Sequence, residues 1–200
     1  MSTDRIEKAL FTTIGATASF PSLIKAVLAP CFLRAASSHG YTKLVIQFGR
    51  GGEALFKESC VKAQRDGPYG LTVEGFDLTD DMMGEMRVVK ASNREGRERQ
   101  EGVVLCHAGT GSVLDALRLG VPVIVVPNSA LLDNHQEQFA EVMEKMEYAV
   151  HGSLENLPAA LTQAETMRKR SKEWPPVNSG VHRQAKGLAG VIDEELGFLD

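Results

Sequence analysis

The residues best suited to chemistry lie in one short loop, His107-Ala108-Gly109-Thr110-Gly111-Ser112, between an apolar run at 103–106 and a helical pattern at 113–119. Glycines and hydroxyl residues at a strand-to-helix turn let backbone N–H groups approach an anion, and the helix adds its positive dipole end. The loop has neither the lysine of a P-loop nor the glycine spacing of a dinucleotide fingerprint. We therefore interpret it as a diphosphate cradle that uses N–H groups, hydroxyls and the helix dipole.

Two sets of polar residues after this loop could bind the ribose and the sugar of a nucleotide sugar. Asp115 lies one helical turn beyond Gly111, where a carboxylate can accept two hydrogen bonds from a ribose diol. The next apolar run, 121–127, leads through a polar loop to Asp133-Asn134-His135-Gln136, which begins another helix with Asp133 or Asn134 as its N-cap. Ligands of open α/β sheets bind at the carboxyl ends of the strands, so these side chains are placed to bind sugar hydroxyls.

Each of these residues also has a purely structural explanation. Gly109 and Gly111 could simply make a tight turn, and Asp115 could be a solvated helix residue. His107 could be a structural histidine at a strand end or a ligand contact, and the residues alone leave both open. His135 is better explained as a polar residue of a first helical turn than as a base. The end of the first strand and the loop after it hold Thr12, Thr13, Gly15 and Thr17. These residues could form a turn or contact the ligand or a partner domain, since that loop faces the same crevice.

The hydrophobic patterns alternate between strands and helices along the whole chain. We predict strands at 8–13, 43–48, 71–76, 103–107, 121–126 and 148–150, and helices from Pro21, at 53–64, 80–87, 111–119, 135–147, 154–170 and 180–197. Such alternation indicates a parallel sheet with helices on both faces, a Rossmann-like doubly wound α/β domain. The almost wholly polar segment 90–102 is predicted to be an exposed loop or a mobile insertion.

The composition narrows the class of protein. Two hundred residues, of which 43% are hydrophobic, suit a single globular domain over 1–200. A net charge of −4 disfavours a nucleic-acid-binding surface. Three cysteines without a CxxC pair read as reduced thiols, so no metal site and no cofactor is expected. No run approaches the ~18 apolar residues of a membrane span, and the N-terminus has no apolar signal core. We expect a cytoplasmic protein.

The chain resembles a known family in three segments. Residues 107–140, which contain HAGTGS and DNHQ, resemble the nucleotide-sugar half of GT-B glycosyltransferases of the bacterial MurG type, family 28. They are more similar still to catalytic subunits of the two-part UDP-N-acetylglucosamine transferases of dolichol-linked oligosaccharide synthesis. Residues 9–21 and 44–50 share the second resemblance. The HAGTGS and DNHQ pair at this spacing is the specific signal, because either motif alone would be weak.

The resemblance implies an activity, a partner and a location. The reaction would be inverting transfer of N-acetylglucosamine from UDP-N-acetylglucosamine to N-acetylglucosaminyl-diphosphodolichol. This chain would be the donor-binding half, and a membrane-anchored, acceptor-binding subunit would recruit it to the cytosolic face of the endoplasmic reticulum. The last helix, 180–197, would dock on that subunit. The donor-binding residues implied are Gly15, Thr17, His107, Gly109, Thr110, Gly111, Ser112, Asp115, Asn134 and Gln136. The general base is not identified, and His107 is only a weak candidate.

Two other functions are weighed against this one. A non-catalytic module could bind a nucleotide sugar in the same place and act only through its partner. The intact glycine loop, together with Asp115 and DNHQ, favours a working site over a relic. A dinucleotide oxidoreductase is disfavoured, because the loop after the first strand reads Gly15-Ala16-Thr17-Ala18-Ser19 and lacks GxGxxG.

Overall fold

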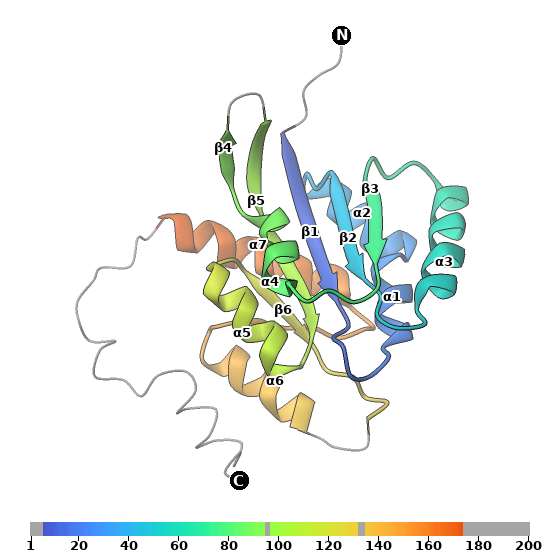
Figure 1. The fold of residues 1–200 in the computed structure, drawn as a ribbon. Helices are drawn as coiled ribbons and strands as arrows, with labels where there is room; N and C mark the ends of the chain where they lie inside the picture. Colours follow the sequence, from blue (N-terminus) through green and yellow to red (C-terminus); the bar gives the residue numbers. More distant parts are fainter. Residues whose placement is uncertain (1–5, 95–96, 132–134, 174–200) are drawn as a thin grey trace, which may run out of the picture.

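The computed structural model describes residues 6–94, 97–131 and 135–173, which form one twisted sheet covered by helices (Figure 1). The strands lie in the order β3-β2-β1-β5-β6-β7, and β4 pairs with β5 outside this path. Every pairing along the path is parallel, and only the β4–β5 pairing is antiparallel. The strands are β1 (Glu7–Thr13), β2 (Lys43–Gln47), β3 (Thr72–Phe76), β4 (Ser92–Arg94), β5 (Arg97–His107), β6 (Val123–Val126) and β7 (Val150–His151).

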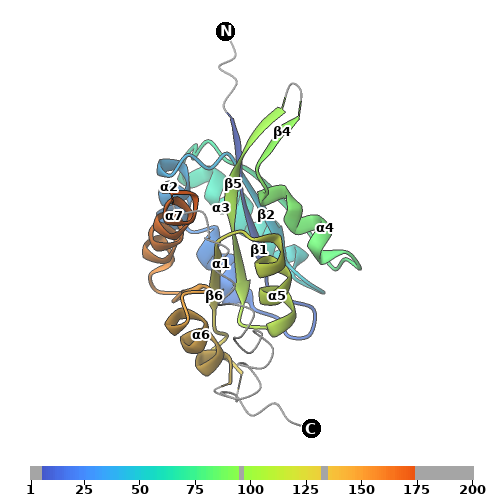
Figure 2. The same cartoon turned by 90° about the vertical axis from the view of Figure 1, so that its left-hand side faces the viewer.

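Helices cover both faces of the sheet because the central strands are apolar on both faces (Figure 2). On one face, Leu10 and Leu105 pack in a cluster with residues of α1 (Pro21–Val27), α2 (Pro30–Ser38), α3 (Glu53–Asp66) and α7 (Leu157–Glu173). On the other face, Phe11 and Val104 pack with α4 (Met82–Met86), the 3-10 turn η1 (Arg87–Val89), α5 (Thr110–Leu119) and α6 (His135–Lys145). The predicted Rossmann-like doubly wound fold is thus confirmed.

Most boundaries agree with the sequence within a few residues, but the region after Pro21 holds two helices where one was expected. Pro30 begins the second helix, after Ala29 in an extended conformation. Proline disfavours the helical region for the residue before it, so the chain has to break there. Among the described helices, none is long and apolar enough to cross a membrane. The helix expected at 180–197 lies outside the described residues.

The prediction that 90–102 is a loop was wrong. The segment contains β4 and the first half of β5, which pair antiparallel with Ser92 opposite Arg99. Figure 1 shows these strands at the end of the sheet where β1 begins. A strand pair with little buried surface needs no alternation of apolar residues, so its sequence looks like a loop. Gly102 lies where β5 joins the core, and a Cβ there would overlap the Ala9 carbonyl, next to a register shift between Lys8 and Leu10.

A buried charged cluster ties α7 to the start of the sheet. Lys8 Nζ lies 2.9 Å from Glu165 Oε1, and their side chains are only 3% and 5% exposed. Tyr41 donates its hydroxyl hydrogen to the same carboxylate, and Arg168 donates to its other oxygen. Burial alone would raise the pKa of Glu165, but the hydrogen bonds from Arg168, Tyr41 and Lys8 outweigh it and hold that pKa below its ordinary value. The ionised carboxylate is therefore part of the folded state.

We expect Glu165→Gln to destabilise the protein by about 3–5 kcal/mol, because Lys8 would keep a buried charge without its partner. A carboxyl whose pKa is lowered by folding contributes stability above its unfolded pKa and loses it as the pH falls through the folded value. The wild-type free energy of unfolding should therefore decline below about pH 4.5, and this contribution should be missing in the variant. Denaturant unfolding at several pH values measures both effects. Glu53→Gln, in an exposed pair with Lys57, is the control and should change little.

Candidate functional site

The loops after β1 and β5 lie side by side at the point where the sheet reverses its winding. From β1 the chain continues to β2 and β3 on one side, and from β5 it continues to β6 and β7 on the other. The first loops therefore leave toward opposite sides, which opens a crevice at the carboxyl ends of the two strands. The glycine loop 107–112 and the loop after Thr13 both lie at this edge. The sequence-predicted residues of the two loops are thus brought together.

The N-terminus of α5 presents free N–H groups. Gly109 is the N-cap, and no side chain of the described residues caps the helix, while Gly109 N–H donates to the His107 carbonyl at 2.8 Å. Val113 N–H donates to the Gly109 carbonyl, so the N–H groups of the three residues between them lack a partner within the helix. These three are Thr110, Gly111 and Ser112. Thr110 and Gly111 are exposed, and a Cβ built on Gly111 meets nothing within 4 Å. An anion can reach these groups directly.

Asp115 lies on the same face of α5 as Gly111, because residues four apart are neighbours on a helix. Its side chain is 27% exposed and accepts from Arg118 Nη1 at 3.2 Å. Arg118 itself is largely exposed, so a ligand hydroxyl could replace it at small cost. The carboxylate is therefore one turn from the free N–H groups and open to a ligand.

His107 lies between the two loops. A Cβ on Gly15 would be 2.6 Å from Nε2 of its ring, and a Cβ on Gly109 would be 2.7 Å from Cε1 and closer still to Nε2. His107 Nδ1 is buried and makes no hydrogen bond of good geometry within the described chain. Burial lowers the pKa of the imidazole, whereas the Thr13 backbone acts in the opposite direction. The net pKa is below the ordinary value, so the ring is neutral at pH 7.

Gln47 is a site residue that the sequence reasoning did not identify. Its side chain is fully buried at the end of β2, where it accepts from the Thr13 hydroxyl and donates to the carbonyls of Gly15 and Asp77. Gly15 N–H in turn donates to the Thr13 hydroxyl at 3.1 Å, and Gly15 has a φ of +81° that favours glycine. This network fixes the loop after β1. A glutamine at the end of the apolar run 44–46 was the available signal.

Asn128 makes a comparable link on the other side, and it was also missed as a site residue. It is buried after β6, donates to the Ser19 carbonyl at 3.3 Å, and accepts from Ala130 N–H. Gln136 accepts from Asn128 N–H through its side-chain oxygen at 2.9 Å, so it holds this loop in place. Thr17 is exposed in the loop after β1. Asn134 lies outside the described residues.

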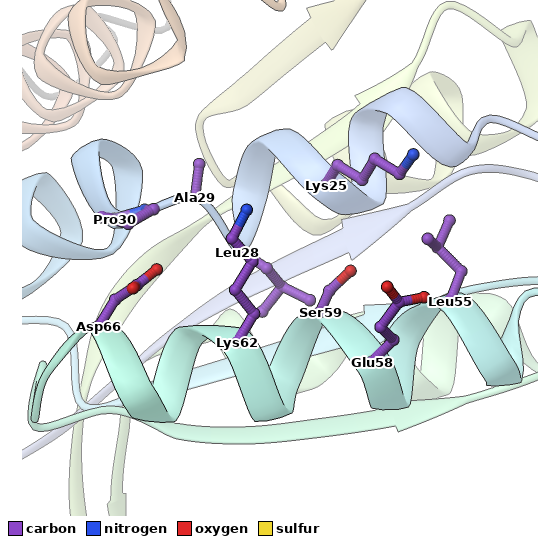
Figure 3. Close-up of a pocket in the computed structure, with 9 residues that line it drawn as sticks. All are labelled: Lys25, Leu28, Ala29, Pro30, Leu55, Glu58, Ser59, Lys62 and Asp66. Atoms are coloured by element: carbon purple, nitrogen blue, oxygen red, sulfur yellow. The ribbon is translucent and has the colours of Figure 1, made fainter.

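A separate hollow lies on the helical layer, away from these loops. Figure 3 shows it between α3 and the segment that joins α1 to α2, with a volume of about 340 Å³. Leu28 and Leu55 are among its apolar lining residues, while Lys62 and Asp66 bring opposite charges. Its lining includes none of the predicted donor-binding residues. The candidate site is therefore the open N-terminus of α5 and not this hollow.

Comparison with known proteins gives consistent relatives over most of the chain. A protein 37% identical over 193 residues is the "UDP-N-acetylglucosamine transferase subunit ALG13" of Yarrowia lipolytica, with 95% of this chain and 85% of that protein covered. The Saccharomyces cerevisiae protein of the same name is 36% identical, with 71% of this chain and 76% of that protein covered.

Solved structures agree with this result. An NMR structure of ALG13 is 27% identical, with a TM-score of 0.59, and the match covers 96% of this chain and 97% of the other. The crystal structure of Acinetobacter baumannii MurG is 17% identical with a TM-score of 0.55, and shares the fold over 96% of this chain but 50% of its own. The model of the glycosyltransferase family 28 C-terminal domain matches residues 9–186. This chain belongs to the glycosyltransferase family 28 C-terminal domain family.

Proposed function

We propose that this chain is the donor-binding, catalytic subunit of a UDP-N-acetylglucosamine transferase. The observation that carries the proposal is the uncapped N-terminus of α5, whose three free N–H groups lie at the switch point of the sheet. Backbone N–H groups at a helix N-terminus bind phosphate well. Relatives named as UDP-N-acetylglucosamine transferase subunits supply the identity of the donor. The transfer would place N-acetylglucosamine on N-acetylglucosaminyl-diphosphodolichol.

The donor would lie along the first two turns of α5. Its diphosphate would accept from the N–H groups of Thr110, Gly111 and Ser112, and its ribose hydroxyls would donate to Asp115. Gly109 contributes close approach and not its own N–H, which is already bonded to His107. Thr17 and Asn134 complete the proposed donor-binding set, while Gly15 and Gln136 hold its loops in position.

The chemistry proposed for this chain is stabilisation of the leaving group. In an inverting displacement the acceptor oxygen attacks the anomeric carbon while the bond to the diphosphate breaks, and negative charge grows on UDP. N–H groups and a helix dipole that are already aimed at that charge lower the barrier without reorganising. We assign no general base among the described residues that face this site.

A second polypeptide is part of the proposal. The chain has the fold of about half of MurG, and the glycine loop is open to solvent. The relatives are named as subunits. These observations support a partner that supplies the acceptor-binding half, and a lipid-linked acceptor requires that partner to be anchored in a membrane. We place the complex at the cytosolic face of the endoplasmic reticulum, with residues 180–197 as the docking segment.

Activity distinguishes a catalytic subunit from a binding module. The full-length chain is co-expressed with candidate membrane partners, and UDP release is measured with a lipid-linked chitobiose precursor as acceptor. We expect release that depends on both the acceptor and this chain. If the chain binds UDP-N-acetylglucosamine but no co-expressed membrane partner gives UDP release, the result would favour the non-catalytic module instead.

The glycine loop is tested by Gly111→Val. Because a Cβ at this position meets nothing in the protein, the fold should survive while the side chain blocks the diphosphate. We expect UDP to bind about tenfold more weakly or worse, a loss of roughly 1.4 kcal/mol or more. NMR titration of the full-length chain with UDP measures it. Ala54→Val, at the matching second position of α3, is the control. Equal affinity in wild type and Gly111→Val would remove the diphosphate from this loop.

Asp115→Ala tests the ribose contact. Each hydrogen bond to a charged group should be worth roughly 1.5–3 kcal/mol, less what water restores. UDP affinity should fall, whereas the affinity for 2′,3′-dideoxy-UDP should hardly change. Arg118→Ala breaks the same ion pair but keeps the carboxylate, so it should bind UDP normally. If Asp115→Ala and wild type discriminate equally between UDP and the dideoxy compound, the ribose lies elsewhere.

A further inference from the structure

The imidazole of His107 is confined by glycines on two separate loops. A Cβ on either Gly15 or Gly109 would overlap the ring, so a side chain at either position would force the imidazole to move. Gly109 has φ −100° and ψ 126°, a conformation open to any residue. Its lack of a side chain is therefore explained by the ring and not by its own backbone. This separates Gly109 from Gly15, whose φ of +81° is a second reason for glycine.

Neither glycine can move away from the ring at small cost. Gly15 is held by hydrogen bonds to Thr13 and Gln47, which are fully buried. On the other side, Ala108 N–H donates to the Val126 carbonyl of β6, and Gly109 is bonded through both its N–H and its carbonyl. The ring thus fills a gap whose two sides are each anchored to a neighbouring strand or helix. A rigid planar ring in this gap sets the distance between the loop after β1 and the loop before α5.

We infer that His107 is a positioning residue whose ring sets the spacing between the loop after β1 and the N-terminus of α5. It acts through its volume, as a neutral spacer, and is neither a base nor a phosphate ligand. The lowered pKa of the half-buried imidazole agrees with this, because a neutral ring can act through its shape without an ionic contact. This inference rests on the proposed function, in that the groups so positioned are those proposed to bind the donor diphosphate.

A double-mutant cycle between His107 and Gly109 tests the spacing. In the wild-type background Gly109→Ala forces the ring and the loop apart, so UDP affinity should fall about tenfold or more. In the His107→Ala background the new Cβ has room, and Gly109→Ala should cost little further affinity. We expect a coupling of about tenfold, which is within the range for residues in contact. Gly111→Ala, whose Cβ meets nothing, is the matched control and should be additive with His107→Ala.

The cycle can overturn the inference. If Gly109→Ala weakens UDP binding equally in both backgrounds, the ring does not set the spacing between the loops, and the inference fails. His107→Gln keeps a neutral, planar side chain and should restore most of the affinity that His107→Ala loses. In the transfer assay His107→Gln should raise KM for the donor and leave kcat nearly unchanged. A loss confined to kcat would identify a base and also overturn the spacer.

Failure of the proposed function would give different results from failure of the spacer inference. If the wild-type chain binds no UDP by itself or with its partner, the donor cradle is wrong, while the cycle can still be measured by thermal unfolding. Coupling between His107 and Gly109 in stability would then support the spacer alone, and its absence would contradict it. If His107→Ala fails to fold, His107→Ser takes its place in the cycle, with the same expected relief of Gly109→Ala.

Discussion

The position of the site depends on one topological constraint, the reversal of the sheet between β1 and β5. Adjacent parallel strands whose chains continue in opposite directions cannot fill the space above their common edge with connections. Here the two loops that begin at this edge contain small residues, Gly15 on one side and Gly109 on the other. The helix that follows β5 starts next to the gap, so its free N–H groups face the space that the topology leaves open. The proposed anion site is thus a consequence of strand order as much as of the glycine loop.

Buried polar side chains make this edge rigid. Gln47 and Asn128 each bond to the backbone of a loop that originates from a different strand. A buried amide left without partners would cost free energy, so each loop conformation is favoured by the need to satisfy these groups. On the proposed function, such anchoring favours binding, because N–H groups that keep their orientation need no reorganisation when a charged ligand arrives. The Lys8–Glu165 cluster lies at the other end of β1. Within the described part of the chain it has no comparable link to the site, and it fixes α7.

The sequence predicted the fold well because its central strands are buried on both faces and read as continuous apolar runs. The same logic failed at 90–102, where strands outside the core carry polar residues and no hydrophobic signal. It also failed for the site's supporting residues. The glycine loop is visible in the sequence because N–H binding requires particular residue types at adjacent positions. Gln47 and Asn128 each bond a partner 30 or more residues away, Asp77 and Ser19. A polar residue at the end of an apolar run marks such a position, but it does not reveal the distant partner.

His107 shows most clearly what a motif can and cannot reveal. A histidine beside a phosphate loop suggests a base or a ligand, and the sequence left its role open. The structure places the ring against two glycines and buries one nitrogen, which favours a role that depends on shape. The charge at the site has a separate consequence. Thr110, Gly111 and Ser112 carry no charge, Asp115 is acidic, and a helix N-terminus supplies the equivalent of about half a positive charge. A bound diphosphate would therefore need cationic or donor groups beyond α5. On the proposed function, a partner lobe that closes over the open glycine loop is where such groups belong, and binding of donor and partner would then favour each other.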